Sequence, residues 1–305
     1  MPLENYSAWL VWVIPLISSL FVPVIGRYSE KIRNYFVVAV ALVTAALALS
    51  LVPSVWSGNG EAVSYSIPWI SGFVEAGVYI DPLSVLFACL VAFFAVIIVV
   101  YSQGYMKGEA GLSRYYFLIL LFIGSMIGLV IADNMLQMFL FWEMVGLCSY
   151  ALISFWYKKQ ESIHSGAKAF IMTRIGDIAL LAAICLLFFM FNSFSFRGTI
   201  VAIQNAASNG SLDVGLLVVV AFLALGGAIA KSAQLPLFTW LYSAMEAPTS
   251  VSALLHAATM VKAGVYLLAR FILIFSVAPI VIEALQPYWF PALVFPSGWH
   301  CRALF

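Results

Sequence analysis

Residues 231–270 read KSAQLPLFTWLYSAMEAPTSVSALLHAATMVKAGVYLLAR and follow directly on an apolar run at 214–230. A lysine, a glutamate, a histidine and a second lysine stand there among side chains otherwise suited to lipid, namely Lys231, Glu246, His256 and Lys262. A lysine near the middle of a bilayer costs about 2.5–3.5 kcal/mol on insertion scales, so such residues are rare unless they face a protein interior or a water-filled path. We therefore interpret this segment as a functional site inside a membrane.

A proline predicts that the helix around Lys231 is broken. Pro236 lacks an N–H group and its ring clashes with the carbonyl group of Ser232, so the helix should end or bend just past Lys231. A straight helix over 214–245 would measure about 48 Å, whereas the hydrocarbon core is about 30 Å thick. Broken helices often mark ion sites in transporters. The alternative is a kinked structural helix whose lysine extends to the membrane surface.

The composition is that of a polytopic membrane protein. Of the 305 residues, 64% are hydrophobic and 9% are charged, and the formal net charge is +1. Soluble domains do not have this balance, and so small a charge points to neither nucleic acid nor an acidic partner. The four cysteines show no CxxC or Cys/His ligand spacing, so we expect no metal site, iron–sulfur cluster or other cofactor in this chain.

The chain is predicted to be an all-α membrane protein with eight to nine transmembrane helices, the seventh of which is discontinuous near Pro236. Apolar runs of spanning length lie at 8–25, 35–55, 82–101, 115–131, 135–155, 167–191, 214–245 and 249–275. A weak ninth span begins around Pro291. The first run lacks the flanks of a signal peptide and is expected to be retained.

Lysine and arginine in the short loops predict the orientation. They follow the first, third and fifth spans but are absent from the loop at 56–81, so the N-terminus is expected outside, with Arg197 as an exception. The aromatic loop at 56–81 is interpreted as a partly structured interfacial lid. Arg270, near the outer end of the last long span, is expected to snorkel to the surface.

Further ionisable residues lie within the predicted spans. Glu143 falls about eight residues into the fifth span, and a lone buried carboxylate is easily neutralised unless a cation is close. Arg174 and Asp177 are three residues apart, share a helix face and are expected to pair. His256 and Lys262 lie on different helix faces but could be successive stations on an oblique path. A protonated structural glutamate, a structural ion pair and a satisfied core histidine are the respective alternatives.

Three stretches resemble the antiporter-like subunits of complex I, the proton-pumping NADH:quinone oxidoreductase. These are residues 231–270 quoted above, DNMLQMFLFWEMVGLCSYALISFWY at 133–157 and KAFIMTRIGDIALL at 168–181. The similarity is closest to the L-chain type, the distal subunit. Lys262 departs from the threonine that is usual in the L-chain type, and it is closer to a variant found in sister subunits and archaeal relatives.

The resemblance implies roles for individual residues. Lys231 would gain and lose the pumped proton, Glu143 would transmit charge, and His256 matches the histidine of the next helix. Our own hypothesis is that His256 and Lys262 relay the proton onward. Arg174 and Asp177 would form an ion pair that links neighbouring subunits. Pro236, at the helix break, and Glu246 are assigned structural or coupling roles.

The resemblance also implies an organisation of the chain. A single transmembrane domain over 1–305 would comprise N-terminal helices at 1–113, a proton-channel helix repeat at 114–275 and the start of a second half at 276–305. The family has a second, inverted repeat, which we do not find, so we expect a truncated chain or a fragment.

These features predict a proton-translocating membrane subunit of a redox-driven NADH:quinone oxidoreductase-type complex. Quinone, flavin and iron–sulfur clusters are expected in its membrane and peripheral partner subunits, with NADH, reduced deazaflavin or ferredoxin as the electron donor. The expected location is the cell membrane rather than the inner mitochondrial membrane. The alternatives are the large subunit of a multi-subunit sodium/proton antiporter, a membrane-bound hydrogenase module and an assembly fragment without transport.

Overall fold

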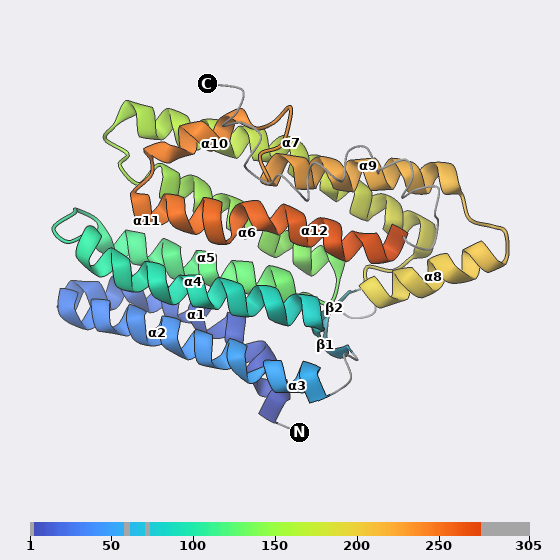
Figure 1. Cartoon of the computed structure of the whole chain (residues 1–305), viewed down its shortest axis with the longest axis horizontal. Helices are drawn as coiled ribbons and strands as arrows, with labels where there is room; N and C mark the ends of the chain where they lie inside the picture. Colours follow the sequence, from blue (N-terminus) through green and yellow to red (C-terminus); the bar gives the residue numbers. More distant parts are fainter. Residues whose placement is uncertain (1–2, 58–61, 71–73, 276–305) are drawn as a thin grey trace.

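The computed structural model describes residues 3–57, 62–70 and 74–275, which form a bundle of long helices with one β-hairpin (Figure 1). Eight helical segments in this part of the chain are long and apolar enough to cross a membrane, so the predicted all-α membrane class is confirmed. They are Tyr6–Tyr28, Glu30–Trp56, Pro82–Tyr105, Leu112–Ile131, Met135–Ile153, Gln160–Phe191, Val214–Lys231 and Thr249–Ile272. The ninth span predicted around Pro291 lies outside the described residues.

The N-terminal helices form one side of the bundle. Helix α1 (Leu3–Tyr28) packs against α2 (Glu30–Ser50) and α5 (Leu112–Ile131), and α4 (Pro82–Tyr105) packs against α2 and α5. Most of α5 is buried, because α1, α4 and α6 (Met135–Ile153) pack around it. The short helix α3 (Val52–Ser57) continues from α2.

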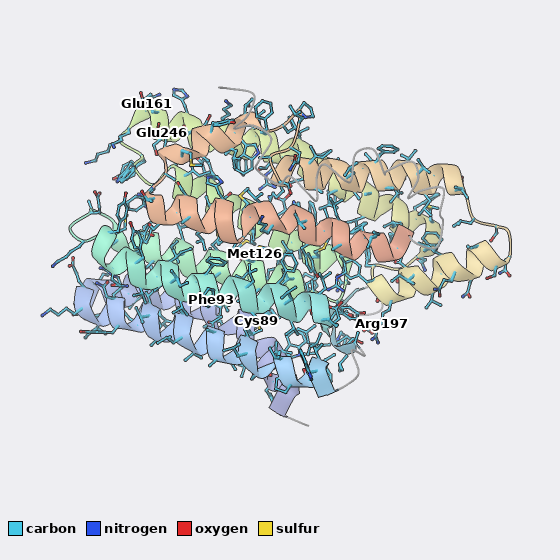
Figure 2. All side chains as sticks on the ribbon, viewed as in Figure 1. Cys89, Phe93, Met126, Glu161, Arg197 and Glu246 are labelled. Atoms are coloured by element: carbon cyan, nitrogen blue, oxygen red, sulfur yellow. The ribbon has the colours of Figure 1, made fainter. Side chains whose placement is uncertain are left out.

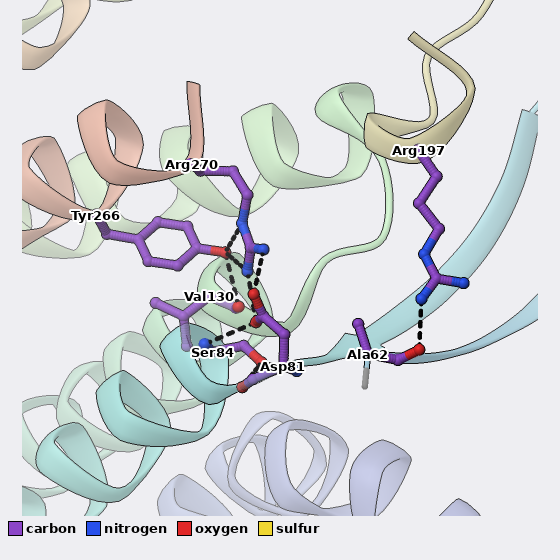
Figure 3. Close-up of polar contacts among 7 residues, drawn as sticks. All are labelled: Ala62, Asp81, Ser84, Val130, Arg197, Tyr266 and Arg270. Atoms are coloured by element: carbon purple, nitrogen blue, oxygen red, sulfur yellow. Dashed lines mark hydrogen bonds and ion pairs between the residues drawn. The ribbon is translucent and has the colours of Figure 1, made fainter. Parts of the chain in front are cut away.

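A hairpin and a short helix lie together at one end of the bundle (Figure 1). The loop predicted as a structured lid folds as the antiparallel strands β1 (Val63–Ile70) and β2 (Val74–Ile80), whose alternating apolar residues favour this pairing. Arg197, in α8 (Phe196–Ser208), donates to the carbonyl oxygen of Ala62 at the start of the hairpin (Figure 3). The loops that join α4 to α5 and α6 to α7 lie at the opposite end (Figure 1).

The C-terminal half packs around one very long helix. Helix α7 (Gln160–Phe191) contacts α6 (Met135–Ile153) on one side and α9 (Val214–Lys231) on the other, and α12 (Met260–Phe275) packs against α9. The start of α7 is earlier than the predicted residue 167, because its first turns are polar and the apolar pattern does not include them.

The predicted break in the seventh span is present, and α9 ends at Lys231. It stops part-way along the bundle, and the chain resumes as α10 (Thr239–Ser243) and the short 3₁₀ helix η1 (Ala244–Glu246) (Figure 1). The Trp240 Nε1 group donates to the carbonyl oxygen of Ala230 at 3.0 Å. The backbone N–H groups of Ser232 and Gln234 donate to the two carbonyl oxygens before it, those of residues 228 and 229. Protein groups thus satisfy the last helical carbonyls up to Ala230, which helps to make unwound chain tolerable at membrane depth.

The last span is interrupted, although its sequence predicts a continuous helix. It comprises α11 (Thr249–Ser252), the π-helix η2 (Ala253–Ala258) and α12. The hydroxyl group of Thr259 bonds to the carbonyl oxygen of Leu254 at 2.6 Å, five residues back, at the point where the regular helix fails. Single π-turns inside helices are frequent at functional sites, and this one contains His256.

The prediction that Arg270 snorkels to the surface is wrong. Its residue exposure is 2%, and its guanidinium group binds both carboxylate oxygens of Asp81 at 2.8 and 3.0 Å (Figure 3). It also donates to the hydroxyl oxygen of Tyr266, which in turn donates to the carbonyl oxygen of Val130 at 2.8 Å. Because Asp81 also caps α4 through the backbone N–H of Ser84, this cluster ties α12 to the start of α4 and the end of α5.

Candidate functional site

Lys231 is fully buried at the C-terminal end of α9, and two glycines make room for it. A Cβ atom on Gly176 of α7 would lie 2.3 Å from the Cβ atom of Ala230, so α7 and α9 approach this closely only with glycine there. A Cβ atom on Gly146 of α6 would lie 2.9 Å from Nζ of Lys231. The ammonium group therefore occupies space that both neighbouring helices leave open.

Four charges of alternating sign connect α6, α7 and α9. Nζ of Lys231 lies 3.6 Å from Oδ1 of Asp177, Oδ2 of Asp177 lies 3.9 Å from a guanidinium nitrogen of Arg174, and Arg174 forms an ion pair with Glu143. We call these residues the charge series. The predicted pair of Arg174 and Asp177 is present, but each residue has a closer partner on another helix.

The outer pair of the charge series is partly exposed, and the inner pair is buried. The side chains of Arg174 and Glu143 are 30% and 21% exposed, whereas those of Asp177 and Lys231 are 2% and 0% exposed. One end of the series is thus accessible from outside the chain, and the other is enclosed within it.

Trp142 is a site residue that the sequence interpretation missed. Its Nε1 group donates to Oδ1 of Asp177 at 2.6 Å, and its ring lies 5.2 Å from Nζ of Lys231. It therefore contacts both members of the buried ion pair. The sequence offers one signal for Trp142, its position directly before Glu143. Because adjacent residues of a helix lie on different faces, this position does not indicate that the two side chains share a site.

His256 lies next to the helix break. Its ring centroid is 6.2 Å from that of Trp240, the residue that bonds to the carbonyl oxygen of Ala230. Both ring nitrogens of His256 and Nζ of Lys231 are buried and have no hydrogen-bond partner within the described residues. Within the described residues, neither the imidazole nor the amine is committed to a hydrogen bond with the protein.

Three predicted residues stand apart from the charge series. Lys262 is half-buried on α12, and no ion pair within the described ranges includes it. Glu246 is exposed at the same end of the bundle as Glu161, opposite the end that carries Arg197 (Figure 2). Pro236 lies in the non-helical segment between α9 and α10. Their predicted roles remain predictions.

Comparison with known proteins identifies the family. The family described as "NADH:quinone oxidoreductase/Mrp antiporter, TM" matches residues 132–292, more than half of the 305 residues, and this match includes the charge series and His256. The chain belongs to this NADH:quinone oxidoreductase/Mrp antiporter family. A second family, the N-terminus of complex I chain 5, matches residues 69–116. The resemblance found in the sequence, including its L-chain type, is thereby confirmed.

Curated relatives of this antiporter family share more than a third of their aligned residues with the chain. NAD(P)H-quinone oxidoreductase chain 5 of Synechocystis is 38% identical over 93% of this chain and 43% of the relative, and that of Picosynechococcus is 37% identical over 91% and 43%. The chloroplastic subunit 5 of Anthoceros angustus is 36% identical over 94% and 40%. The chain thus spans less than half the length of these relatives.

Two solved structures have the same fold. The Mrp complex from Dietzia has a chain that is 30% identical, with a TM-score of 0.78 over 91% of this chain and 29% of that one. The archaeal membrane-bound sulfane sulfur reductase has a TM-score of 0.75 over 85% of this chain and 51% of that one, and its 22% identity supports the fold alone. Both solved structures are complexes, and the second is described as an archaeal respiratory membrane complex.

Proposed function

We propose that this chain contributes a proton half-channel to a membrane subunit of an NADH:quinone oxidoreductase-type complex. The observation that carries the proposal is the fully buried Lys231 at the helix break, with Asp177 at 3.6 Å and a charge series that leads outward from it. A buried ionisable lysine with a carboxylate partner inside a membrane protein is a functional group by default. The family match supports the proposal independently.

Competition for Asp177 would control the proton on Lys231. Burial disfavours the ammonium form, and the carboxylate of Asp177 favours it. Asp177 has two other partners, the indole of Trp142 and, at 3.9 Å, Arg174. If Glu143 released Arg174, the guanidinium group would be free to draw the carboxylate away from the lysine.

The size of this effect follows from Coulomb's law. If the carboxylate moved from 3.6 Å to about 6 Å from Nζ, the attraction would fall by about 2 kcal/mol at an effective dielectric constant of about 20. This free energy changes the protonation equilibrium roughly 20-fold. One such displacement is a moderate switch, so several coupled sites would be needed to move protons against a large gradient.

His256 would receive the proton that Lys231 releases, and Lys262 would be the next station. Trp240 lies beside the imidazole ring, but its N–H group is committed to the carbonyl oxygen of Ala230 and an indole has no acceptor. Trp240 therefore positions His256 and does not carry the proton itself. Water would bridge the two basic groups.

Redox chemistry would take place in partner subunits. We propose that quinone, flavin and iron–sulfur clusters lie in membrane and peripheral partners, and that electron transfer there displaces charges near Glu143. The names of the cyanobacterial and chloroplast relatives favour NAD(P)H as the electron donor and a bacterial or thylakoid membrane as the location. The N-terminus is expected outside, as the positions of lysine and arginine predict.

A second candidate function is cation/proton exchange without redox chemistry. The Mrp structure supports it, because that chain has 30% identity over 91% of this one. In this case the charge series would respond to a sodium ion bound elsewhere in the assembly rather than to electron transfer.

One experiment separates the two functions. Inside-out vesicles from cells that carry this protein would be energised with NADH or with a sodium gradient, and proton uptake would be followed by quenching of an acridine dye. The proposed function predicts uptake with NADH that Lys231→Ala abolishes while the complex remains assembled. Lys168→Ala, which removes an exposed lysine from α7, is the matched control and should pump normally. Unchanged NADH-driven uptake in Lys231→Ala would contradict the assigned role.

A further inference from the structure

A basic pocket lies at the end of the bundle opposite the hairpin. It is a cavity of about 340 Å³ between the loop that joins α4 to α5 and the loop that joins α6 to α7. Its cationic lining residues are Arg114, Lys158 and Lys159, and Glu109 is its single carboxylate. None of these residues belongs to the charge series, and the proposed proton path does not use them.

The cations of the basic pocket are unpaired within the part of the chain that the structure describes. No ion pair within the described residues includes Arg114, Lys158 or Lys159. One guanidinium nitrogen of Arg114 donates to the carbonyl oxygen of Phe155 at 2.7 Å, which leaves most of its five donors for another group. The carboxylate of Glu109 accepts a hydrogen bond from the indole of Trp156 at 3.2 Å. The pocket thus carries a net positive charge that favours an anion.

Two helix N-termini add to this charge. Helix α5 begins after Gly111 and helix α7 begins after Lys159, and neither N-cap residue provides a side-chain hydrogen bond. Both N-cap residues line the basic pocket. The first backbone N–H groups of a helix and its dipole attract anions, so these two helix starts reinforce the three cationic side chains.

The position of the basic pocket in the membrane identifies the kind of anion. The spans of α5 and α6 end at Leu112 and Ile153, so the pocket lies at the level where these helices leave the hydrocarbon. Trp156 and Tyr157 line it, and such aromatic residues are enriched at the head-group level. On α6, Leu147 and Tyr150 are exposed, which offers apolar surface deeper in the bilayer.

We propose that the basic pocket binds the phosphate group of an anionic phospholipid, whose acyl chains lie against the exposed face of α6. Aromatic rings hold the cations in place, since Lys159 Nζ is 4.5 Å from the Trp156 ring and the Arg114 guanidinium is 4.7 Å from the Tyr157 ring. Basic residues near an anionic membrane surface each strengthen binding about fivefold. The three cations together should therefore contribute roughly 100-fold selectivity for phosphatidylglycerol over phosphatidylcholine.

Native mass spectrometry of the delipidated full chain tests this proposal. Phosphatidylglycerol and phosphatidylcholine are titrated separately, and the bound fraction is compared between the parent and the triple variant Arg114→Gln/Lys158→Gln/Lys159→Gln. The matched control is Arg27→Gln/Lys31→Gln/Lys107→Gln, which removes the same number of arginines and lysines from exposed positions. The pocket variant should lose roughly 100-fold in affinity for phosphatidylglycerol alone, and the control should bind like the parent. Equal losses in both variants, or no loss in the pocket variant, would overturn the proposal.

Two further measurements keep the test independent of variant folding. A phosphatidylglycerol with a photoreactive head group is cross-linked to the parent chain, and the labelled peptides should contain residues 109–114 and 155–159. Labelling confined to other peptides would refute the site. Inorganic phosphate, added at the same concentration as the lipid, should leave the lipid bound. Full displacement by phosphate would show a site for free phosphate instead of a lipid.

Discussion

The buried ion pair of Arg270 and Asp81 offers a direct test of how this bundle is held together. In Arg270→Met the side chain keeps most of its apolar volume but loses the guanidinium group. The carboxylate of Asp81 then remains with a side-chain exposure of only 11% and without its bidentate partner. The hydroxyl oxygen of Tyr266 loses both donors at the same time. We therefore predict a large loss of stability.

The magnitude follows from the isolation of the remaining charge. Removal of one partner from a buried ion pair destabilises a protein by about 3–5 kcal/mol, because the other charge stays buried and unpaired. The backbone N–H of Ser84 still bonds to Asp81 at 2.9 Å but does not neutralise it. In Asp81→Asn/Arg270→Met the charge is absent and asparagine still caps α4. The double variant should therefore recover most of the loss.

The assay uses a buried thiol as the reporter of opening. Cys148 has 0% exposure, so a maleimide dye reaches it only when the bundle opens. The other cysteines, at 89, 185 and 301, are replaced by serine. If labelling follows the opening equilibrium, 3–5 kcal/mol corresponds to a rate increase between about 150-fold and 5,000-fold in Arg270→Met. Labelling as slow as in the parent would mean that Arg270 reaches solvent. A double variant as fast as the single one would mean that lost packing, rather than unpaired charge, causes the effect.

Three further predictions concern the charge series and the hairpin end. Gly146→Ala should displace the buried ammonium group of Lys231, because its nitrogen would lie 2.9 Å from the new Cβ atom, and NADH-driven proton uptake should fall. Gly104→Ala is the control and should leave uptake unchanged, because a Cβ atom there would meet no atom within 4 Å. Trp142→Phe should remove a hydrogen bond to a charged group worth about 1.5–3 kcal/mol and thus accelerate thiol labelling, and an unchanged rate would show that Asp177 finds another donor. Burial raises the pKa of the Asp133 carboxyl group, so its ionised form destabilises the fold as pH rises through that pKa. Asp133→Asn should therefore slow labelling near pH 8 and lose this effect as pH falls towards about 4, whereas a constant effect over this range would exclude titration of Asp133.

Local signals in the sequence predicted the spans and the helix break. Apolar length defines a spanning helix, and Pro236 removes a backbone donor, so both features are visible without tertiary structure. The interruption at His256 has no such signal, because the segment contains neither proline nor glycine before Thr259. The π-turn there depends on packing between helices that the sequence pattern does not specify.

The partners of the charged residues show the same limit. Spacing identified the contact of Arg174 with Asp177, since residues three apart share a helix face. The ion pairs of Arg174 with Glu143 and of Lys231 with Asp177 join different helices, and no helical period relates their positions. Arg270 is the clearest case, because its partner lies 189 residues away in the chain. From the sequence alone, a charged residue near the end of a span is interpreted as snorkelling. Only the folded structure shows that an oppositely charged residue lies beside it.

The gradient of burial along the charge series gives the proposed half-channel a direction. Asp177 and Lys231 are enclosed by α6, α7 and α9, so a charged group outside the chain meets the partly exposed Glu143 and Arg174 first. Glu143 and Arg174 are partly exposed. Arg174 contacts Asp177 directly, and Glu143 is linked to Asp177 through Arg174. A neighbouring subunit that places a charge against Glu143 could therefore act on the lysine through a rearrangement of ion-pair partners, in addition to any direct attraction. Under the proposed function, a driving subunit would act through Glu143 and Arg174, and its effect would reach the proton at the helix break.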